Sequence, residues 1–510
     1  MTDFFRRPLG WCLAAGAVVS LGFALRVAYH DRGYGHPDET ITVEIVKYMR
    51  RSGDWDTNWA KADLDPSFRY DQYNFSSHLY ANFFFYRLVK LLPGTAGWRS
   101  ELEGFWVYRF FSVALASLAV GQVLRLGQRA GGRAAALGAG VLAATSLLLV
   151  QDAHYVRPEA FLTVLTLWAV ALGWPDGRLR PGRVLGAGFL IGLLVACKVS
   201  MLLLAWLPLV PLVVAWRGGE TNWRVLAALP LALGAGFAAG APGAVAHPDV
   251  FLRGVQHLVT QYAGAHPPHS HVHGGPVAGM MARYFVATLG WPAVACFAVG
   301  LGGLLWRRRW AEMALLAGPV AVFAVFFATQ TVFFERNLSP VLPLFFVVAA
   351  LGALTIGAAC AARVRLPGVG AGVAVLMFGW LLIRPLQLTG PLLWVEFSGR
   401  GAQRHDAFEL ALRARHPSAE WMETSLLNDG PLEQLAADFR AGRGPFLLRV
   451  TDFSDEWNAR HLPLLAARFL ARPLAEYPGT FPDLPVCTLQ TYHSAHDRYF
   501  LVTGQRREAD

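Results

Sequence analysis

The sequence predicts an all-α protein with many membrane-spanning helices, followed by a small α/β domain at its C-terminal end. Of its 510 residues, 54% are hydrophobic and only 16% are charged, whereas soluble domains are typically about 45–50% apolar and about 25% charged. The mean hydropathy is positive, at +0.37. This composition excludes a disordered chain, a fibrous chain and an ordinary cytosolic enzyme.

The apolar runs set the number of spans, because a helix needs about 20 apolar residues to cross a bilayer. About eleven runs qualify, at residues 9–28, 105–124, 134–151, 157–174, 184–198, 200–216, 225–244, 279–305, 312–333, 338–359 and 369–388. The first run is long for a signal peptide, and no small-x-small cleavage site follows it. We therefore interpret it as an uncleaved span.

Arginine placement predicts the orientation, since Lys and Arg gather in short cytoplasmic loops. With the N-terminus inside, alternate loops carry clusters such as Arg125, Arg129 and Arg133. This places the segments 29–104 and 245–278, and the chain after about residue 389, outside the plasma (bacterial inner) membrane. The predicted domains are a transmembrane domain at 1–388 and an extracytoplasmic domain at 389–510. Much of the net charge of +10 then comes from cytoplasmic Arg residues that fix the orientation, so it indicates no nucleic-acid partner.

The C-terminal segment differs from the rest of the chain in composition. It is rich in Arg, Asp and Glu, with apolar runs at 444–450 and 462–470. Such patterning is typical of a small soluble α/β domain.

Ionisable residues near span ends are candidates for function, because they are costly at membrane depth. They are Arg26, Arg109, Asp152, Arg157, Glu159, Lys198, Arg283, Glu335, Arg336 and Arg384. In the predicted topology all of them fall toward the outer side, whereas a transporter places such groups near the midplane of repeated halves. Snorkelling to headgroups is the alternative for any single Arg, but it explains Asp152 and Glu159 poorly.

The first outer loop opens with His36-Pro37-Asp38-Glu39 and continues as a predicted helix. Proline and acidic residues suit the first turn of a helix, which is a purely structural explanation. The functional alternative is a carboxylate near the membrane surface that takes a proton from an attacking hydroxyl.

Three further polar segments border spans on the outer side. The run 152–159 contains Asp152, His154, Arg157 and Glu159, and a solvated turn is the alternative there. Lys198 interrupts a long apolar run, and its ammonium needs an anionic partner such as a phosphate. The third segment, 334–337, opens a late span.

The loop 245–278 is rich in histidine. His269, His271 and His273 alternate, as metal ligands sometimes do. The flanking Pro and Gly residues favour a flexible loop without metal, and both interpretations remain open.

Taken in order, these segments resemble the GT-C glycosyltransferases that use polyprenyl-phosphate sugars, and most of all the branch of protein O-mannosyltransferases and aminoarabinose transferases. The residues 36–39, 44–49 and 52–55 are similar to its first-loop acidic motif, and 154–162 to its second motif, where many members have Asp at the position of Glu159. Cys197-Lys198 is similar to its lysine after a Gly-rich span, and 335–343 to its late Arg-x-x-x-Pro-x-x-Pro signature. The likeness covers residues 9–360.

The resemblance implies a GT-C fold and an inverting transfer of a hexose or pentose from a polyprenyl-phosphate donor to an acceptor hydroxyl at the outer face. Asp38 would be the general base, and Glu39 would orient it or support the acceptor. The substrate-binding residues implied are His36, Asp152, His154, Arg157, Glu159, Lys198, Arg283, Glu335 and Arg336.

The same resemblance implies that no cofactor is required. Binding of a divalent cation near Asp38 remains an open alternative. The acceptor would be a protein, a lipid or a polysaccharide. Two other functions remain alternatives: a transporter or flippase for lipid-linked sugars, and a non-catalytic protein of cell-envelope assembly.

Overall fold

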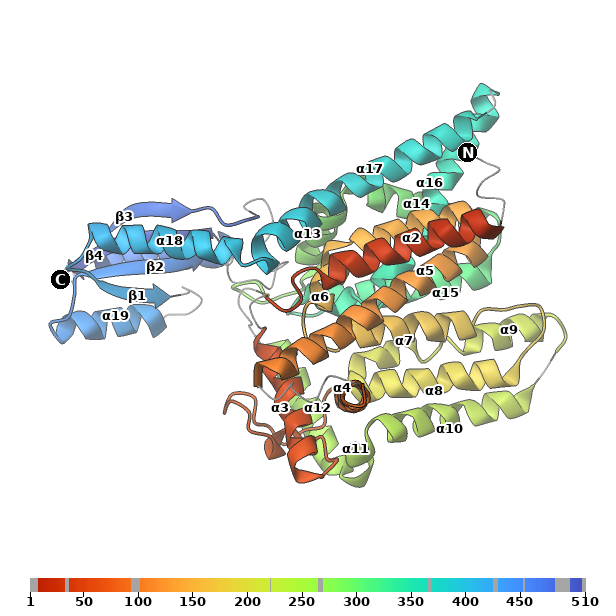
Figure 1. Cartoon of the computed structure of the whole chain (residues 1–510), viewed down its shortest axis with the longest axis horizontal. Coiled ribbons are helices and arrows are strands. Elements are labelled where there is room, and N and C mark those ends of the chain that lie inside the picture. The colour runs from red at the N-terminus through yellow and green to blue at the C-terminus, as the bar shows by residue number, and fades with distance from the viewer. Residues whose placement is uncertain are drawn as a thin grey trace.

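The structure is a computed structural model that describes residues 8–32, 36–92, 101–220, 222–264, 269–365, 368–424, 430–452, 455–481 and 496–506. A large helical bundle makes up most of it, and a smaller domain with a β-sheet extends from one end of the bundle (Figure 1). The predicted combination of an all-α membrane part and a small C-terminal α/β domain is confirmed.

The helices of the bundle follow the apolar runs and the first loop. They are α2 (Pro8–Val27), α3 (Pro37–Ser52), α4 (Ser76–Lys90), α5 (Glu101–Thr145), α6 (Leu147–Ala153), α7 (Glu159–Leu172), α8 (Pro181–Cys197), α9 (Leu209–Arg217), α10 (Trp223–Gly240), α11 (Pro242–Ala246), α12 (Pro248–Ala263), α13 (Ala278–Leu289), α14 (Trp291–Trp306), α15 (Trp310–Ala328), α16 (Leu342–Val364) and α17 (Val369–Pro391). Shorter turns are η1 (Trp59–Lys61), η3 (Val199–Leu204), η4 (Glu335–Leu338) and the π-helical η5 (Leu392–Phe397).

Within the described residues, seven helices are long and apolar enough to cross a membrane, and eight if the bent pair α13 and α14 counts as one span. The apolar helices α7 and α8 are shorter than this test requires. Together with a division of α5 into two, they account for the difference from about eleven predicted spans.

The division of α5 comes from a glycine turn. Gly132 has a φ of 77° and breaks the helical geometry. A Cβ on Gly127 would lie 2.8 Å from the Cα of Ala136, and a Cβ on Gly140 would lie 2.6 Å from Leu124 Cδ2. The two halves of α5 therefore pack against each other as an antiparallel hairpin, which the predicted runs 105–124 and 134–151 anticipate.

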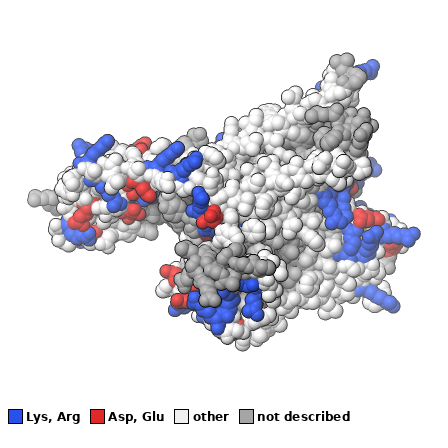
Figure 2. All heavy atoms as spheres, in the orientation of Figure 1, with Lys and Arg blue, Asp and Glu red and all other residues white. Residues whose placement is uncertain are grey.

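The surface of the bundle fits a bilayer. Charged side chains gather at its two ends, with a band almost free of charge between them (Figure 2). Large apolar side chains of α10, α15 and α17, such as Leu231, Val325 and Leu376, are exposed, as lipid-facing residues are. Inside, α16 is buried along most of its length, and Gly352 allows close approach to α14, since a Cβ there would lie 1.8 Å from Cys296 O.

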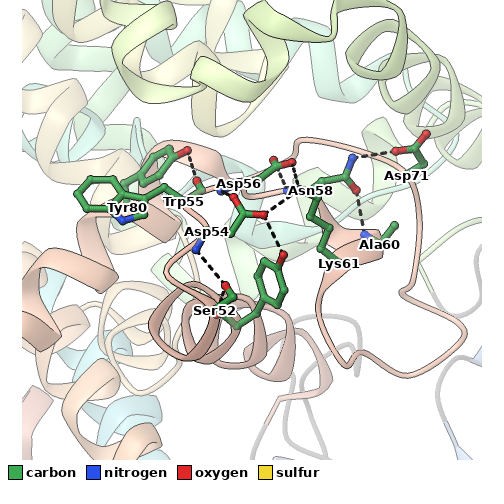
Figure 3. Close-up of polar contacts among 10 residues, drawn as sticks. Ser52, Asp54, Trp55, Asp56, Asn58, Ala60, Lys61, Asp71 and Tyr80 are labelled. Carbon is green, nitrogen blue, oxygen red and sulfur yellow. Dashed lines mark hydrogen bonds and ion pairs between the residues drawn. The ribbon is translucent and has the colours of Figure 1, made fainter.

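The first loop folds as its own small unit against the bundle. Buried residues of α3, including Ile45 and Met49, share a core with residues of α4 such as Phe83. After α3, the Lys61 ammonium lies 2.9 Å from both Asp54 and Asp56, as Figure 3 shows. Hydrogen bonding from Lys61 lowers the pKa of Asp54 to about 2. These contacts fix the chain that follows α3.

The C-terminal domain comprises α18 (Arg400–Arg415), β1 (Glu420–Thr424), α19 (Gly430–Arg440), β2 (Phe446–Asp452), α20 (Asp455–Arg468), β3 (Phe469–Tyr477) and β4 (His496–Gln505). The strand order is β1-β2-β4-β3, with β1 parallel to β2 and the other pairs antiparallel. Apolar residues of β2 and β4, such as Phe446 and Val502, pack against Leu435 of α19. The domain lies at the same end of the bundle as α3 (Figure 1).

Candidate active site

Four of the predicted polar segments meet at the end of the bundle that carries α3. They are the first turn of α3, the turn between α6 and α7, the residue after α8, and η4 before α16. Each follows or precedes an apolar helix, so its side chains lie where buried helix ends need polar partners.

His36 and Asp38 stand at the start of α3. His36 is the N-cap, and its Nδ1 accepts a hydrogen bond from the Asp38 N–H at 3.1 Å. Burial, aided by the charges of Arg157 and Arg336, holds the pKa of His36 well below its usual value. The imidazole is therefore neutral, and its 3.6 Å contact with Asp38 is no ion pair. Asp38 instead pairs with Arg336, whose Nη2 lies 3.4 Å from Oδ2.

Glu39 is fully buried and fully bonded. Its Oε1 accepts from Arg109 Nε and from the Val156 N–H, both at 2.8 Å. Its Oε2 accepts from Arg109 Nη2 at 2.8 Å and from the His36 N–H at 2.7 Å. Glu39 thus joins α3, α5 and the α6–α7 turn. With both oxygens occupied, Glu39 fixes the first turn of α3, which carries Asp38.

A network of ion pairs links Asp38 to the α6–α7 turn. Glu159 Oε2 lies 3.2 Å from Arg157 Nε, and Glu159 Oε1 lies 4.0 Å from Arg336 Nε. Arg336 therefore bridges Asp38 and Glu159 with one guanidinium. Glu159 and Arg157 are almost fully buried, while the Asp38 side chain is 23% exposed. Of the three acids Asp38, Glu39 and Glu159, Asp38 is the one that solvent reaches most.

Lys198 joins this group through Asn337. The helix α8 ends at Cys197, and Lys198 is extended, with φ −149° and ψ 118°. Its Nζ donates to Asn337 Oδ1 at 2.5 Å, and Asn337 Nδ2 lies 3.4 Å from the Tyr262 hydroxyl. Asn337 directly follows Arg336, so η4 carries one cation, the Arg336 guanidinium, and holds the other, the Lys198 ammonium, through Asn337. The sequence does not predict these contacts of Asn337 and Tyr262, because both side chains are uncharged and do not stand out near a span end.

Two more buried carboxyl groups lie beside the network. Asp152 Oδ2 accepts from the Ser339 hydroxyl at 2.5 Å. Asp152 Oδ1 and both oxygens of Glu335 have no hydrogen-bond partner among the described residues. Burial raises the pKa of Glu335 to about 7, against the opposing charge of Arg336. These buried oxygens are acceptors, or donors when protonated, whose hydrogen-bonding capacity is unused among the described residues.

Two predicted substrate-binding residues do not join the cluster. The His154 ring stacks on Phe397 at 4.1 Å, and its nitrogens lie 2.7 Å from Val150 O and 2.8 Å from Ala28 O. It serves packing between α6, α2 and η5. Arg283 is exposed on α13 and has no hydrogen bond or ion pair with any described residue. The structure therefore brings neither side chain to the network.

The histidines of the 245–278 loop find separate partners. His271 lies against Glu456, and the His269 ring lies 4.5 Å from Phe334. In the part of the chain that the structure describes, no group of three or more His, Cys, Asp or Glu residues is placed to hold a metal ion. Residues 265–268, which include His266, lie outside the described residues.

The same overall fold is found in solved structures of ArnT and of an archaeal oligosaccharyltransferase. ArnT from Cupriavidus metallidurans in the apo state aligns with a TM-score of 0.52 at 16% identity, covering 96% of this chain and 98% of ArnT. The apo oligosaccharyltransferase of Archaeoglobus fulgidus aligns with a TM-score of 0.51 at 14% identity, covering 76% of this chain and 56% of that one. No protein-family model and no curated protein matches the sequence. The GT-C fold that the motifs predict is confirmed.

Proposed function

We propose that this chain, which has the GT-C fold, is an integral-membrane glycosyltransferase. It transfers a sugar from a polyprenyl-phosphate donor to an acceptor hydroxyl at the outer face of the membrane, with inversion. The observation that carries the proposal is Asp38, a reachable carboxylate held beside Arg336 at the end of a membrane bundle.

The donor phosphate is assigned to the cations of the cluster. The Arg336 guanidinium lies 3.4 Å from Asp38, and the Lys198 ammonium donates one hydrogen bond to Asn337. An ammonium has three N–H donors, so Lys198 has further donors with which to bind a phosphate. Fixed cations stabilise the charge that develops on a departing phosphate. ArnT from Cupriavidus metallidurans is known in a form bound to undecaprenyl phosphate, and we propose the same class of donor here.

The acceptor is activated by Asp38. Its carboxylate takes the proton of the acceptor hydroxyl while the hydroxyl oxygen forms a bond to the anomeric carbon. The bond from that carbon to the phosphate oxygen breaks on the opposite face, and the polyprenyl phosphate leaves with the electron pair. Attack from the face opposite the leaving group inverts the anomeric configuration. Glu39, through Arg109, holds the first turn of α3 in position for this step.

Sugar recognition is assigned to the buried acids. Glu159, Asp152 and Glu335 surround Arg157 and Arg336 from the α6–α7 turn and η4. Carboxyl oxygens without a protein partner suit the hydroxyl groups of a sugar. This set does not distinguish a hexose from a pentose, so the proposal extends to both.

Charge placement supports an outer location of the site. The C-terminal domain and α3 lie at one end of the bundle (Figure 1), and the Arg-rich loops of the predicted cytoplasmic side connect helices at the other. The cluster therefore faces outward, toward an acceptor protein, lipid or polysaccharide. Because it lies at one end and not at the centre of the bundle, a transporter is not favoured.

The test is a transfer assay with purified protein in lipid nanodiscs. Polyprenyl-phosphate hexoses and pentoses are supplied with envelope extract from a strain that lacks the protein, and release of free polyprenyl phosphate is followed by mass spectrometry. The proposal predicts release that depends on both the donor and the extract. Movement of intact donor across the bilayer without release of polyprenyl phosphate would identify a flippase instead.

A further inference from the structure

We infer that the C-terminal domain helps to position Arg336, with Glu456 of α20 as the positioning residue. The connection runs through residues 269–277, which we call the strap. The consequence for donor binding rests on the proposed function, but the physical connection does not.

The first link joins the C-terminal domain to the strap. Glu456 Oε1 accepts a hydrogen bond from the Val272 N–H at 2.9 Å, and Oε2 lies 2.8 Å from His271 Nδ1. One carboxylate therefore holds two successive residues of the strap. The domain also meets the bundle at Thr480, whose hydroxyl bonds Glu396, and at Phe481, which is buried in a cluster with Leu147 and Tyr155.

The second link joins the strap to the segment that precedes η4. The Phe333 N–H donates to His269 O at 2.7 Å, and the Val277 N–H donates to Gln330 O at 3.0 Å. Val277 is fully buried in the main core of the bundle. Since both ends of the strap bond to residues 330–333, a displacement of the strap is passed to that segment.

The third link is the ring of Phe334. It lies 4.5 Å from the His269 ring, and the Arg336 guanidinium lies 4.4 Å from its centroid. In such a cation–π contact the ring face attracts the guanidinium electrostatically. From Phe334 the chain of contacts therefore reaches Arg336, and through it Asp38.

The ionic contacts of Arg336 make it sensitive to this support. Its nitrogens lie 3.4 Å from Asp38 and 4.0 Å from Glu159. Charge-assisted hydrogen bonds are typically about 2.7–2.9 Å long, so neither acid fixes the guanidinium tightly. The direction of Arg336 is therefore set in good part by Phe334, and a contiguous set of contacts leads from there to Glu456.

Contiguity alone does not show energetic coupling, so the test measures transmission. Hydrogen–deuterium exchange is compared for wild type and Glu456→Ala in nanodiscs, in peptides covering 269–277 and 330–338. We expect faster exchange in both peptides, although Glu456 contacts only the first. Affinity for undecaprenyl phosphate, measured by native mass spectrometry, should weaken about 3- to 10-fold.

Two variants complete the design. Glu456→Gln keeps an oxygen for the Val272 N–H and should restore most of the protection and affinity. Glu433→Ala removes another Glu of the same domain, whose partner is Arg468 on the surface, and should change neither readout. Unchanged exchange in 330–338, or unchanged lipid affinity, in Glu456→Ala would overturn the inference. If wild type does not bind undecaprenyl phosphate, the proposed function fails, and the exchange data still decide whether the strap transmits.

Discussion

The pair of Glu39 and Arg109 gives the sharpest prediction about stability. Arg109→Met removes two charge-assisted hydrogen bonds of 2.8 Å from a carboxylate with no exposed surface. Bonds to charged groups contribute about 1.5–3 kcal/mol each, which gives about 3–6 kcal/mol. Breaking a buried ion pair by removing one partner typically costs about 3–5 kcal/mol, so the two estimates agree.

The assay is equilibrium unfolding of the detergent-solubilised protein. Arg109→Met should lower the free energy of unfolding by about 3–5 kcal/mol. The double variant Glu39→Gln/Arg109→Met should be less destabilised than the sum of its single variants, because no buried charge is left unpaired. Arg283→Met is the matched control, since Arg283 is exposed on another apolar helix, α13, and its loss should change stability by about 0.5 kcal/mol or less. A stable Arg109→Met variant, or strictly additive effects, would refute the structural role of Glu39.

Three further predictions concern single residues. Lys198→Met should weaken binding of undecaprenyl phosphate about 10- to 100-fold, the loss of one charge-assisted contact, as measured by native mass spectrometry. The pKa of Glu335 is raised from 4.5 to about 7, so between these pH values the native state holds a proton that the unfolded chain has lost. The free energy of unfolding should therefore fall as pH rises from about 4.5 to 7 and then level off. Glu335→Gln should remove this slope when unfolding is measured against pH. Asp497→Asn should destabilise the C-terminal domain by about 3–5 kcal/mol in thermal unfolding, because the buried carboxylate lies 2.7 Å from His405 and 3.1 Å from Arg449.

The local pattern of apolar residues was sufficient to predict the helices of the bundle. The apolar runs locate the helices of the bundle, and the break at Lys198 appears in the structure as the end of α8. The glycine turn inside α5 also agrees with two predicted runs. These features depend on residues close together in the chain, which is why sequence alone predicts them.

Pairing between distant segments was beyond the sequence. Glu39 and Arg109 are 70 residues apart, and no local signal indicates that they meet. The same holds for His154, whose charge-bearing motif suggests a ligand but whose ring stacks on Phe397. Arg283 is similar: its position near a span end is visible in the sequence, but the direction of its side chain depends on how α13 packs.

The central claim is that Asp38 is the general base. Asp38→Asn keeps the size of the side chain and removes its ability to take a proton. We expect release of polyprenyl phosphate from the donor to fall about 10²- to 10⁴-fold, the usual contribution of general-base catalysis, with binding of undecaprenyl phosphate nearly unchanged. Asp63→Asn is the control, because this acid of the same loop has a side chain that is 96% exposed and lies outside the cluster. A rate for Asp38→Asn equal to that of wild type would contradict the account.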